Sequence, residues 1–370
     1  MTKFPTIGIL GGGQLAQMLA IDGYPLGFRF VFFDPTADAC AGLVGQLIVA
    51  DYDNEIALED FAKKCDYVTY DFENVPVQAA EFVAKNTQIF PHPNTLEIAQ
   101  DRLKEKLLFS KQLDLPVGAF YSVDSYSELL FAVKSCDNDG FLKTRRMGYD
   151  GKGQHRITDK TDLKLLWDEI EGGSFILEQA VHFNREVSVI LARNAIGEIM
   201  FYELCENKHK QGILTTTLVP AQPSQYSVTA FEYAKKIANE LSYIGVLTIE
   251  MFETDEGLFI NEMAPRVHNS GHWSIEGAVT SQFENHLRAG LGLPLGSTEM
   301  SKGYSAMINW IGEIPLVGLT SKEKDVYWHI YGKQNRPGRK VGHSTVVADN
   351  AQELHSKVVK LAKLLGSSNQ

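Results

Sequence analysis

The chain has 370 residues, a formal net charge of −11, 44% hydrophobic residues and four cysteines. This length is enough for two or three domains with a large core, and the acidic balance argues against a nucleic-acid binder, which would need a basic face. No apolar run approaches the length of a membrane span and no signal peptide is evident, so we expect a cytoplasmic protein. The cysteines are too far apart for a zinc knot or a redox pair, and we expect free thiols.

The first part of the chain alternates strand-like and helical patterns. Strands are expected at residues 6–10, 30–34, 47–51, 66–71 and 88–92, with helical patterns between them, for example at 14–24. A βαβ pattern of this kind predicts a doubly wound parallel sheet. A long helix is predicted next, at 95–113, and Pro116 prevents the helix from continuing further.

The rest of the chain mixes strands and helices. Strands are expected at 141–144, 174–178, 186–192, 199–202, 247–252, 258–263 and 304–310, and helices at 162–170, 231–243 and 351–365. The fold class is therefore α/β followed by α+β. We divide the chain into an N-terminal Rossmann-like domain (1–105), a central domain (106–298) with a flexible subdomain at about 117–185, and a small C-terminal domain with a basic loop (299–370).

A glycine-rich turn follows the first predicted strand and opens the first helix. Its sequence, GGGQLA at 11–16, fits G-x-G-x-x-[GA], and Asp34 lies where dinucleotide folds place a ribose-binding acid. One hypothesis is therefore an NAD-dependent oxidoreductase. The physical argument supports any anion at the helix N-terminus, where Gly13, Gln14 and Leu15 present backbone N–H groups.

A second glycine-rich loop, MGYDGKGQ at 147–154, lies between two predicted strands, so it is not a Walker A loop. Its glycines at 148, 151 and 153 let the backbone approach triphosphate oxygens, and Lys143 on the preceding strand adds a positive charge. The alternative is a flexible surface hairpin.

Two glutamates are expected on one β-hairpin. A three-residue loop at 255–257 sets Glu250 opposite Glu262, whereas a loop one residue longer would pair Glu250 with Asn261. Facing carboxylates on an apolar sheet are unfavourable unless a cation lies between them, and hard oxygen ligands suit Mg²⁺ carrying nucleotide phosphates. The alternative is a solvated strand face with two unrelated glutamates.

Several longer strings resemble one family. They are KTRRMGYDGKGQ (143–154), ILEQAVHFNREVSV (176–189) and NEMAPRVHNSGHWSIEGAVTSQFENHLRAGLGLPLG (261–296), together with GGGQLAQM (11–18), FENVP (72–76), QDRLKEK (100–106) and RPGRKVGH (336–343). In this order they are similar to the ATP-grasp enzymes, and among these to the 5-(carboxyamino)imidazole ribonucleotide synthetase family of purine biosynthesis. The resemblance covers nearly the whole chain and implies an ATP-grasp fold.

The resemblance implies an ATP-dependent ligase that carboxylates 5-aminoimidazole ribonucleotide with bicarbonate through carboxyphosphate. The expected cofactors are ATP and Mg²⁺, which Mn²⁺ could replace, and the expected assembly is a homodimer. By similarity, the metal carboxylates are Glu250 and Glu262, with Asn261 beside them. The other nucleotide-binding residues implied are Arg102, Lys143, Gly148, Tyr149, Asp150, Gly151, Lys152, Gly153, Gln154, Glu178, Gln179, Ala180, Val181, Glu186 and His209.

The acceptor nucleotide needs a second set of residues. Residues expected by similarity around the imidazole and the reacting carboxyl group are Glu73, Tyr149, Asp150, Lys152, Arg266, His268 and Asn269. Asp150 and His268 are both candidates for the group that takes the amine proton. The acceptor phosphate has two candidate sites, the first glycine turn and the basic loop with Lys333, Arg336, Arg339 and Lys340.

The chain departs from the family pattern at three places. Met147 stands where a small residue or glycine is expected, and Val267 replaces a common proline. Ala16 and Gln17 replace a glycine and a basic residue, which removes a positive charge from the first turn and favours the basic loop as the phosphate site. There are two further alternatives to this function. One is another ATP-grasp ligase that acts on a phosphorylated ribonucleotide, and the other is a non-catalytic binding protein.

Overall fold

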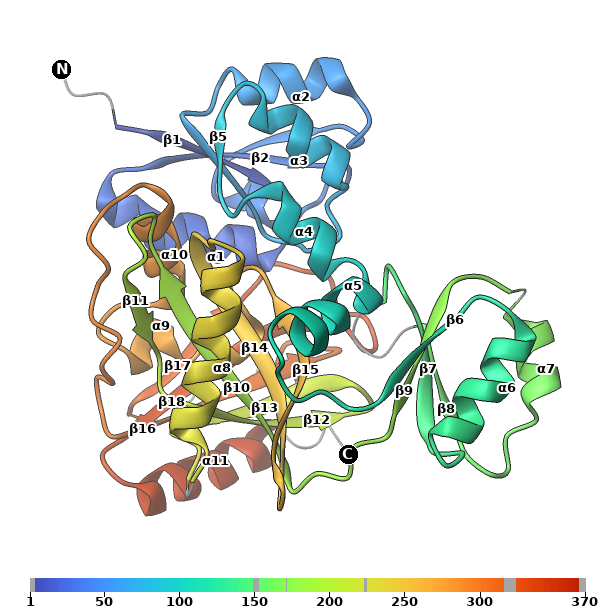
Figure 1. Cartoon of the computed structure of the whole chain (residues 1–370). Helices are drawn as coiled ribbons and strands as arrows, with labels where there is room; N and C mark the ends of the chain where they lie inside the picture. The colour runs from blue at the N-terminus through green and yellow to red at the C-terminus, as the bar shows by residue number, and fades with distance from the viewer. Residues whose placement is uncertain (1–3, 149–152, 171, 223–224, 316–323, 366–370) are drawn as a thin grey trace.

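The computed structural model describes residues 4–148, 153–170, 172–222, 225–315 and 324–365. Figure 1 shows the N-terminal domain at the top, a small lobe standing off to the right, and a large sheet with its helices below. None of the helices in these ranges is sufficiently long and apolar for a bilayer crossing. All four cysteines, Cys40, Cys65, Cys136 and Cys205, are buried free thiols, as expected.

The N-terminal domain contains a five-stranded parallel sheet in the order β3-β2-β1-β4-β5. Its strands are β1 (Thr6–Leu10), β2 (Arg29–Asp34), β3 (Gln46–Val49), β4 (Tyr67–Tyr70) and β5 (Gln88–Ile89), and its helices are α1 (Gln14–Gly23), α2 (Glu55–Ala62) and α3 (Val77–Ala84). This confirms the predicted doubly wound sheet. β5 is shorter than predicted because Pro91 has no N–H group with which to continue the ladder.

The long helix predicted at 95–113 is wrong, because the chain forms α4 (Pro93–Ala99), α5 (Arg102–Leu107) and a π-helical turn (Leu108–Gln112). Asp101 has an extended backbone conformation, and its side chain caps α5 by accepting hydrogen bonds from the N–H groups of Leu103 and Lys104. The same carboxylate accepts two hydrogen bonds from Arg145, at 3.0 and 2.6 Å. An aspartate N-cap with these partners outweighs the helical pattern that continues through it.

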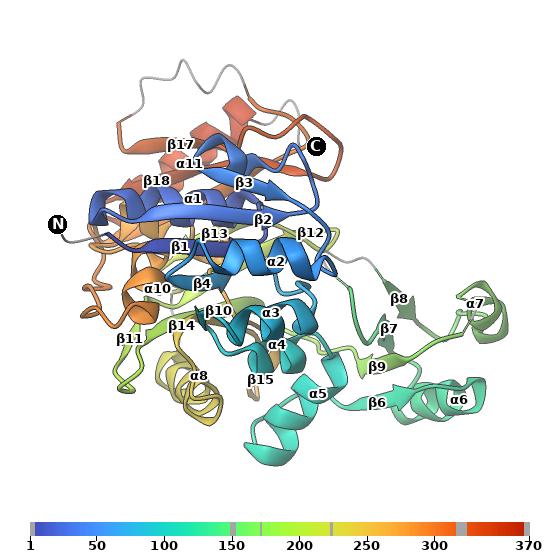
Figure 2. The same cartoon turned by 90° about the horizontal axis from the view of Figure 1, so that it is seen from above.

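The small lobe is a four-stranded antiparallel sheet in the order β6-β9-β7-β8. Its strands are β6 (Phe120–Val123), β7 (Gly140–Thr144), β8 (Gln154–Ile157) and β9 (Phe175–Gln179), and its helices are α6 (Tyr126–Ser135) and α7 (Leu163–Glu169). Seen from above in Figure 2, this lobe again projects from the body of the molecule. It has its own apolar core, which includes Leu129, Leu142 and Leu177.

The largest sheet has nine strands, in the order β15-β14-β10-β12-β13-β16-β18-β17, with β11 paired to β10. Its strands are β10 (Arg185–Arg193), β11 (Ile199–Phe201), β12 (Cys205–Lys210), β13 (Ile213–Val219), β14 (Gly245–Thr254), β15 (Gly257–Ala264), β16 (Tyr304–Ile311), β17 (Val326–Ile330) and β18 (Lys340–Ala348). The accompanying helices are α8 (Ser227–Glu240), α9 (Ser274–Gly277), α10 (Gln282–Gly290) and α11 (Ala351–Leu365). The strands of the predicted C-terminal domain thus continue the sheet of the central domain.

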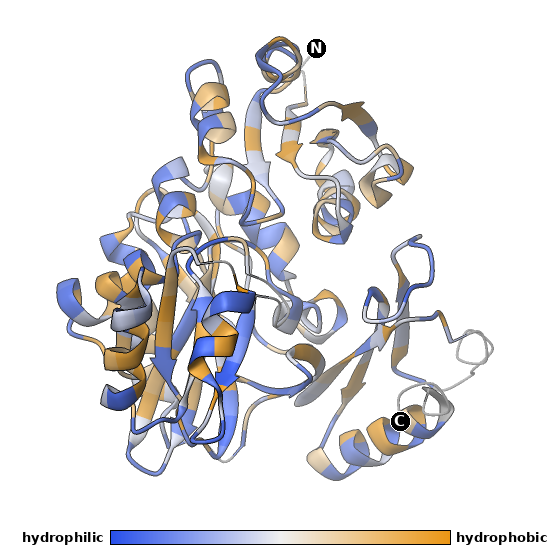
Figure 3. Cartoon of the chain, turned by 90° about the vertical axis from the view of Figure 1, so that its right-hand side faces the viewer, coloured by the Kyte–Doolittle hydropathy of each residue, from blue (hydrophilic) through white to orange (hydrophobic). Residues whose placement is uncertain are grey.

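One apolar cluster joins the N-terminal domain to this sheet. Ile9 and Leu19 share it with Trp273, Phe283 and Leu287, and all five side chains are fully buried. Figure 3 shows hydrophobic residues on the strands and on one side of the surrounding helices. Because burial of such side chains stabilises an interface by roughly 1.5–3 kcal/mol each, this cluster fixes the position of α1 against α10 and so the geometry between the two domains.

Candidate active site

A cavity of about 920 Å³ opens between the N-terminal domain, the small lobe and the nine-stranded sheet. It is lined by most of the site residues predicted from the sequence. These are Gly13, Gln14, Leu15, Glu73, Arg102, Lys143, Gly148, Gln154, Glu178, Gln179, Val181, Glu186, His209, Glu250, Asn261, Glu262, Arg266, His268, Asn269, Lys333, Arg336, Arg339 and Lys340. Segments far apart in the sequence therefore meet around one space.

The hairpin of β14 and β15 holds the two glutamates opposite each other. Thr254 pairs with Gly257, so the turn differs from the predicted loop at 255–257, and this register alone would set Glu250 against Asn261. A β-bulge next to Glu250 shifts the register and places Glu250 opposite Glu262. The predicted pair is right and the predicted turn is wrong, because turn residues do not reveal a bulge further along the strands.

Each of these carboxylates has a basic partner. The Nε2 atom of His268 lies 3.0 Å from Glu250 Oε1, and Arg102 Nη1 donates to Glu262 Oε2 at 2.8 Å. Burial raises the pKa of Glu250, but the hydrogen bond from His268 and the nearby charges of His209 and Lys340 outweigh it and lower the pKa below its ordinary value. Glu250 is therefore anionic at neutral pH.

Glu178, at the end of β9, is a buried anion between two lysines. Its Oε2 atom lies 3.1 Å from Lys143 Nζ and 3.2 Å from Lys106 Nζ. Burial raises the pKa of Glu178, whereas the charges of Lys106 and Lys143 lower it, to about 2 in total. Its Oε1 atom is buried and has no hydrogen-bond partner among the described residues, so a ligand donor would be favourable there.

The segment after Glu178 was predicted to bind the nucleotide base. Gln179 and Val181 line the cavity, but Ala180 lies outside its lining and donates its N–H to the carbonyl oxygen of Asp139 at 3.0 Å. Beyond this segment the Phe183 and Phe252 rings stack with centroids 4.7 Å apart.

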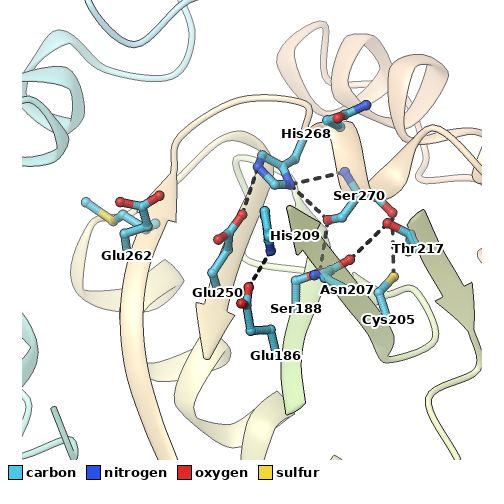
Figure 4. Close-up of polar contacts among 12 residues, drawn as sticks. Glu186, Ser188, Cys205, Asn207, His209, Thr217, Glu250, Glu262, His268 and Ser270 are labelled. Atoms are coloured by element: carbon cyan, nitrogen blue, oxygen red, sulfur yellow. Dashed lines mark hydrogen bonds and ion pairs between the residues drawn. The ribbon is translucent and has the colours of Figure 1, made fainter. Parts of the chain in front are cut away.

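Glu186 and His209 form an ion pair on the face of β10 and β12 that lines the cavity (Figure 4). Burial lowers the pKa of His209, but the hydrogen bond to Glu186 and the charge of Glu250 raise it above its ordinary value. The sequence pattern alone could not show whether His209 is a site residue or an ordinary surface residue. In the structure it lines the cavity.

The second glycine loop is described only at its ends. Tyr149, Asp150, Gly151 and Lys152 lie outside the described residues, Gly148 and Gln154 line the cavity, and Gly153 does not. Met147, which departs from an expected small residue or glycine, has a φ of 64° and a mostly exposed side chain. That conformation explains why glycine suits this position.

The N-terminus of α1 already has anionic partners from the protein itself. Asp71 Oδ2 accepts hydrogen bonds from the N–H groups of Gly13 and Ala16, at 2.9 and 3.2 Å. Asp34 accepts hydrogen bonds from the N–H groups of Gly12 and Thr36, both at 2.8 Å. Asp34 therefore holds the turn together, which gives no support to its predicted alternative role as an NAD ribose ligand.

The acceptor residues predicted by similarity come together near the carboxylate pair. Arg266 forms an ion pair with Glu73, and His268 bonds Glu250. Asn269 exchanges two amide hydrogen bonds with Asn309, at 3.1 and 2.6 Å.

The basic loop reaches this region from the C-terminal side. Lys333 donates a hydrogen bond to Gln14 of the first turn, and Arg336, Arg339 and Lys340 line the same cavity. The two candidate phosphate sites are therefore neighbours.

Sequence reasoning missed several residues that line the cavity. Lys106 donates to the Asn261 carbonyl at 2.6 Å, and Glu105 accepts a hydrogen bond from the Met263 N–H at 2.8 Å. Burial and the charge of Glu262 raise the pKa of Glu105 to about 8. The signal was present, since both residues belong to QDRLKEK, from which only Arg102 was selected.

Comparison with known protein families assigns most of the chain to three domain models. Residues 4–100 match the ribonucleotide synthetase preATP-grasp domain, residues 108–283 the ATP-grasp domain, and residues 305–357 the phosphoribosylaminoimidazole carboxylase C-terminal domain. The N5-carboxyaminoimidazole ribonucleotide synthase of Pseudomonas aeruginosa is 43% identical over 359 residues, which cover 97% of this chain and 99% of the relative. The chain belongs to the N5-carboxyaminoimidazole ribonucleotide synthase family.

Solved structures of this family have the same fold. The N5-carboxyaminoimidazole ribonucleotide synthetase of Thermus thermophilus superposes with a TM-score of 0.93 at 46% identity, covering 98% of this chain and 99% of that one. The Aspergillus clavatus synthase in complex with ADP and 5-aminoimidazole ribonucleotide gives a TM-score of 0.90 at 27% identity, covering 99% and 100%. The predicted fold, family and class of enzyme, an ATP-grasp ligase of purine biosynthesis, are confirmed.

Proposed function

We propose that this chain carboxylates 5-aminoimidazole ribonucleotide with bicarbonate, using ATP and releasing ADP and phosphate. The observation that carries the proposal is one cavity. It is lined by most of the residues expected to bind ATP, by the carboxylate pair and by the basic loop. Lys143 interacts electrostatically with Glu178 and Glu262, and Arg266 and Lys340 interact in the same way with Glu250. A γ-phosphoryl group at the pair would therefore lie next to the acceptor.

The residues present fit a divalent cation. Glu250 and Glu262 face each other on one hairpin and line the same cavity, and anionic carboxylate oxygens are the ligands that Mg²⁺ prefers. We infer that these two residues hold Mg²⁺, or Mn²⁺ in its place, which supplies charge neutralisation at the β- and γ-phosphates when bound.

The chain's own residues would position and neutralise the reacting groups. Lys143 and Arg102 are basic side chains at the carboxylate pair, and the orphan Oε1 of Glu178 is suited to accept a hydrogen bond from the amino group of adenine. Bicarbonate oxygen attacks the γ-phosphoryl group, giving ADP and carboxyphosphate, a step that requires alignment more than covalent help from the protein. We assign Tyr149, Asp150 and Lys152 to the loop that covers this short-lived intermediate.

The acceptor would lie between Glu73, Arg266, Asn269 and the basic loop. Its amine then attacks the carboxyl carbon of carboxyphosphate and displaces phosphate, or attacks CO₂ after carboxyphosphate has released phosphate, and in either case the amine loses a proton. Because Asp71 and Asp34 already occupy the Gly12, Gly13 and Ala16 N–H groups, the basic loop is the stronger site for the acceptor phosphate. Gln14 and Leu15 would contact it from the first turn.

The test is ADP release by the purified chain. Release should require both bicarbonate and 5-aminoimidazole ribonucleotide for full rate and should disappear without Mg²⁺. Rapid ADP formation with a different ribonucleotide and a different carbon donor, and none with this pair, would instead indicate another ATP-grasp ligase.

Neutralising the basic loop tests the acceptor site. In the double variant Arg339→Ala, Lys340→Ala we expect the KM for the aminoimidazole nucleotide to rise by about 10- to 100-fold, because each lost charge-assisted contact contributes about 1.5–3 kcal/mol at most. The KM for ATP should change little. Initial rates at varied concentrations of each substrate measure both, and equal effects on the two would remove the basic loop from the acceptor site.

Three further assignments extend the proposal. The family resemblance favours a homodimer, and composition favours the cytoplasm. We retain the domain division at residues 105 and 298, with the subdomain at about 117–185, although the first boundary falls within α5. Sedimentation of the purified chain measures whether it is a homodimer.

A further inference from the structure

Buried polar side chains form a row across the nine-stranded sheet, on the strands that follow Glu250 on the side away from Glu262. The strand register sets Ser188 beside Glu250 and Cys205, and Asn207 beside Thr217 (Figure 4). Ser188 and Thr217 are 0% exposed and Asn207 is 5% exposed. Burying such groups costs free energy unless each has a hydrogen-bond partner. The proposed reaction gives none of them a role.

Hydrogen bonds connect this row to His268 through Ser270. Asn207 Nδ2 donates to Ser188 Oγ at 2.9 Å, and the Ser188 and Ser270 hydroxyl oxygens are also 2.9 Å apart. Ser270 Oγ lies 2.8 Å from His268 Nδ1. On the other side of the imidazole ring, Nε2 faces Glu250 Oε1 at 3.0 Å. The row therefore ends on a proposed metal ligand.

The protons along this row run in one direction. Thr217 Oγ1 donates to Asn207 Oδ1 at 2.9 Å, which turns the Asn207 amide so that Nδ2 faces Ser188. Ser188 accepts that bond, which leaves its own proton available for Ser270 Oγ. Ser270 in turn has one proton for His268 Nδ1. In this arrangement the hydroxyl groups of Ser188 and Ser270 both accept and donate.

The backbone provides independent support for the same direction. The N–H of Ser270 points at His268 Nδ1 at 3.3 Å, and an N–H group can only donate. Nδ1 must therefore carry a lone pair, and the ring proton is on Nε2, facing Glu250. A proton on Nδ1 would set this N–H and the backbone N–H of Ser270 against each other.

We propose that Ser188, Asn207 and Ser270 are positioning residues that hold His268 as the neutral Nε2–H tautomer, so that His268 is a fixed hydrogen-bond donor to Glu250. The inference rests on the proposed function, in which Glu250 holds the metal. It also decides between the two candidates for the amine proton. Both ring nitrogens of His268 are engaged, so His268 presents no lone pair to the acceptor and another group takes that proton.

Nuclear magnetic resonance of the ¹⁵N-histidine-labelled protein reads the tautomer directly. Of the ten histidines, the His268 signals are those lost in His268→Gln. We expect an unprotonated Nδ1 and a protonated Nε2 at neutral pH. The preference should be weakened in Ser270→Ala, where only the backbone N–H of residue 270 still faces Nδ1, and weakened less in Ser188→Ala, which keeps the Ser270 hydroxyl. Ser344→Ala is the matched control, because Ser344 is equally buried but bonds Trp310 at 2.9 Å. A protonated Nδ1 in the wild type would overturn the proposal.

Enzyme kinetics show whether His268 acts as a hydrogen-bond donor or as a general base. Glutamine can place an N–H where His268 has Nε2–H, so His268→Gln should keep activity within about tenfold of the wild type. His268→Ala should lose about 10- to 100-fold, the effect of losing a hydrogen bond to a charged group. If both variants lose activity equally, by about 10²- to 10⁴-fold, His268 is a base and the proposal is wrong.

A failure of this tautomer proposal can be distinguished from a failure of the proposed function. The tautomer is measured without turnover, so it stands or falls whatever reaction the enzyme catalyses. A wild-type chain that shows the expected tautomer but no ADP release with bicarbonate and the aminoimidazole nucleotide would contradict the proposed function alone.

Discussion

Glu262→Gln is expected to reduce the kcat of ADP release by at least about 100-fold while the protein stays folded. Glutamine keeps the size of the side chain but removes the negative charge that faces Glu250 across the hairpin. Losing one preorganised charge at a phosphoryl-transfer site has an effect of about 10²–10³. Stability should change little, because the Glu262 side chain is 40% exposed and its ion pair with Arg102 is screened by solvent.

The control for this variant lies on the same hairpin. Glu256→Gln makes the same chemical change at the exposed turn, away from the cavity, and should leave ADP release unchanged. Thermal unfolding of both variants shows whether the fold is intact. Normal ATP hydrolysis by Glu262→Gln in Mg²⁺ would mean that the assignment of the metal ligands is wrong.

The sequence predicted those parts of the fold that depend on local patterns. The parallel sheet followed from alternating strands and helices, and α1 follows its glycine turn at Gln14 as expected. The break between α4 and α5 was missed because it depends on Asp101 accepting hydrogen bonds from Arg145, which is distant in sequence. The nine-stranded sheet was missed for the same reason: β16 pairs with β13 across a long connection that no local pattern records.

The site shows the same division between local and long-range information. Glu250 and Glu262 could be paired from one hairpin, although a bulge that the sequence did not reveal produces the register. His209 could not be placed, since its role depends on Glu186 on a neighbouring strand. Ser188, Asn207 and Ser270 are ordinary polar residues in the sequence. Only the sheet register and the Asn269–Gly271 turn bring them into one row.

The second large effect is expected from Lys106→Met, which removes a buried ammonium group shared by Glu178 and the hairpin of β14 and β15. Lys106 Nζ lies 3.2 Å from Glu178 Oε2 and donates to the Asn261 carbonyl at 2.6 Å, and Asn261 is the residue next to Glu262. Removing one partner of a buried pair costs about 3–5 kcal/mol, and the remaining contact between Lys143 and Glu178 places this loss near ~3 kcal/mol at neutral pH. The KM for ATP should also rise.

The pH dependence of this loss identifies its cause. The pKa of Glu178 lies at about 2 in the folded chain against an ordinary 4.5, because the charges of Lys106 and Lys143 outweigh the effect of burial. A lowered pKa contributes stability above about pH 4.5 that is lost as the pH falls toward about 2. In Lys106→Met the pKa of Glu178 returns toward its ordinary value, so the difference in unfolding free energy between wild type and variant should shrink as the pH falls from about 4.5 toward about 2. Lys104→Met on the same helix removes only an exposed ion pair with Glu97 and should leave the free energy of unfolding nearly unchanged. Urea unfolding at several pH values measures these differences, and a Lys106→Met loss of constant size would show that Lys106 acts by packing rather than by charge.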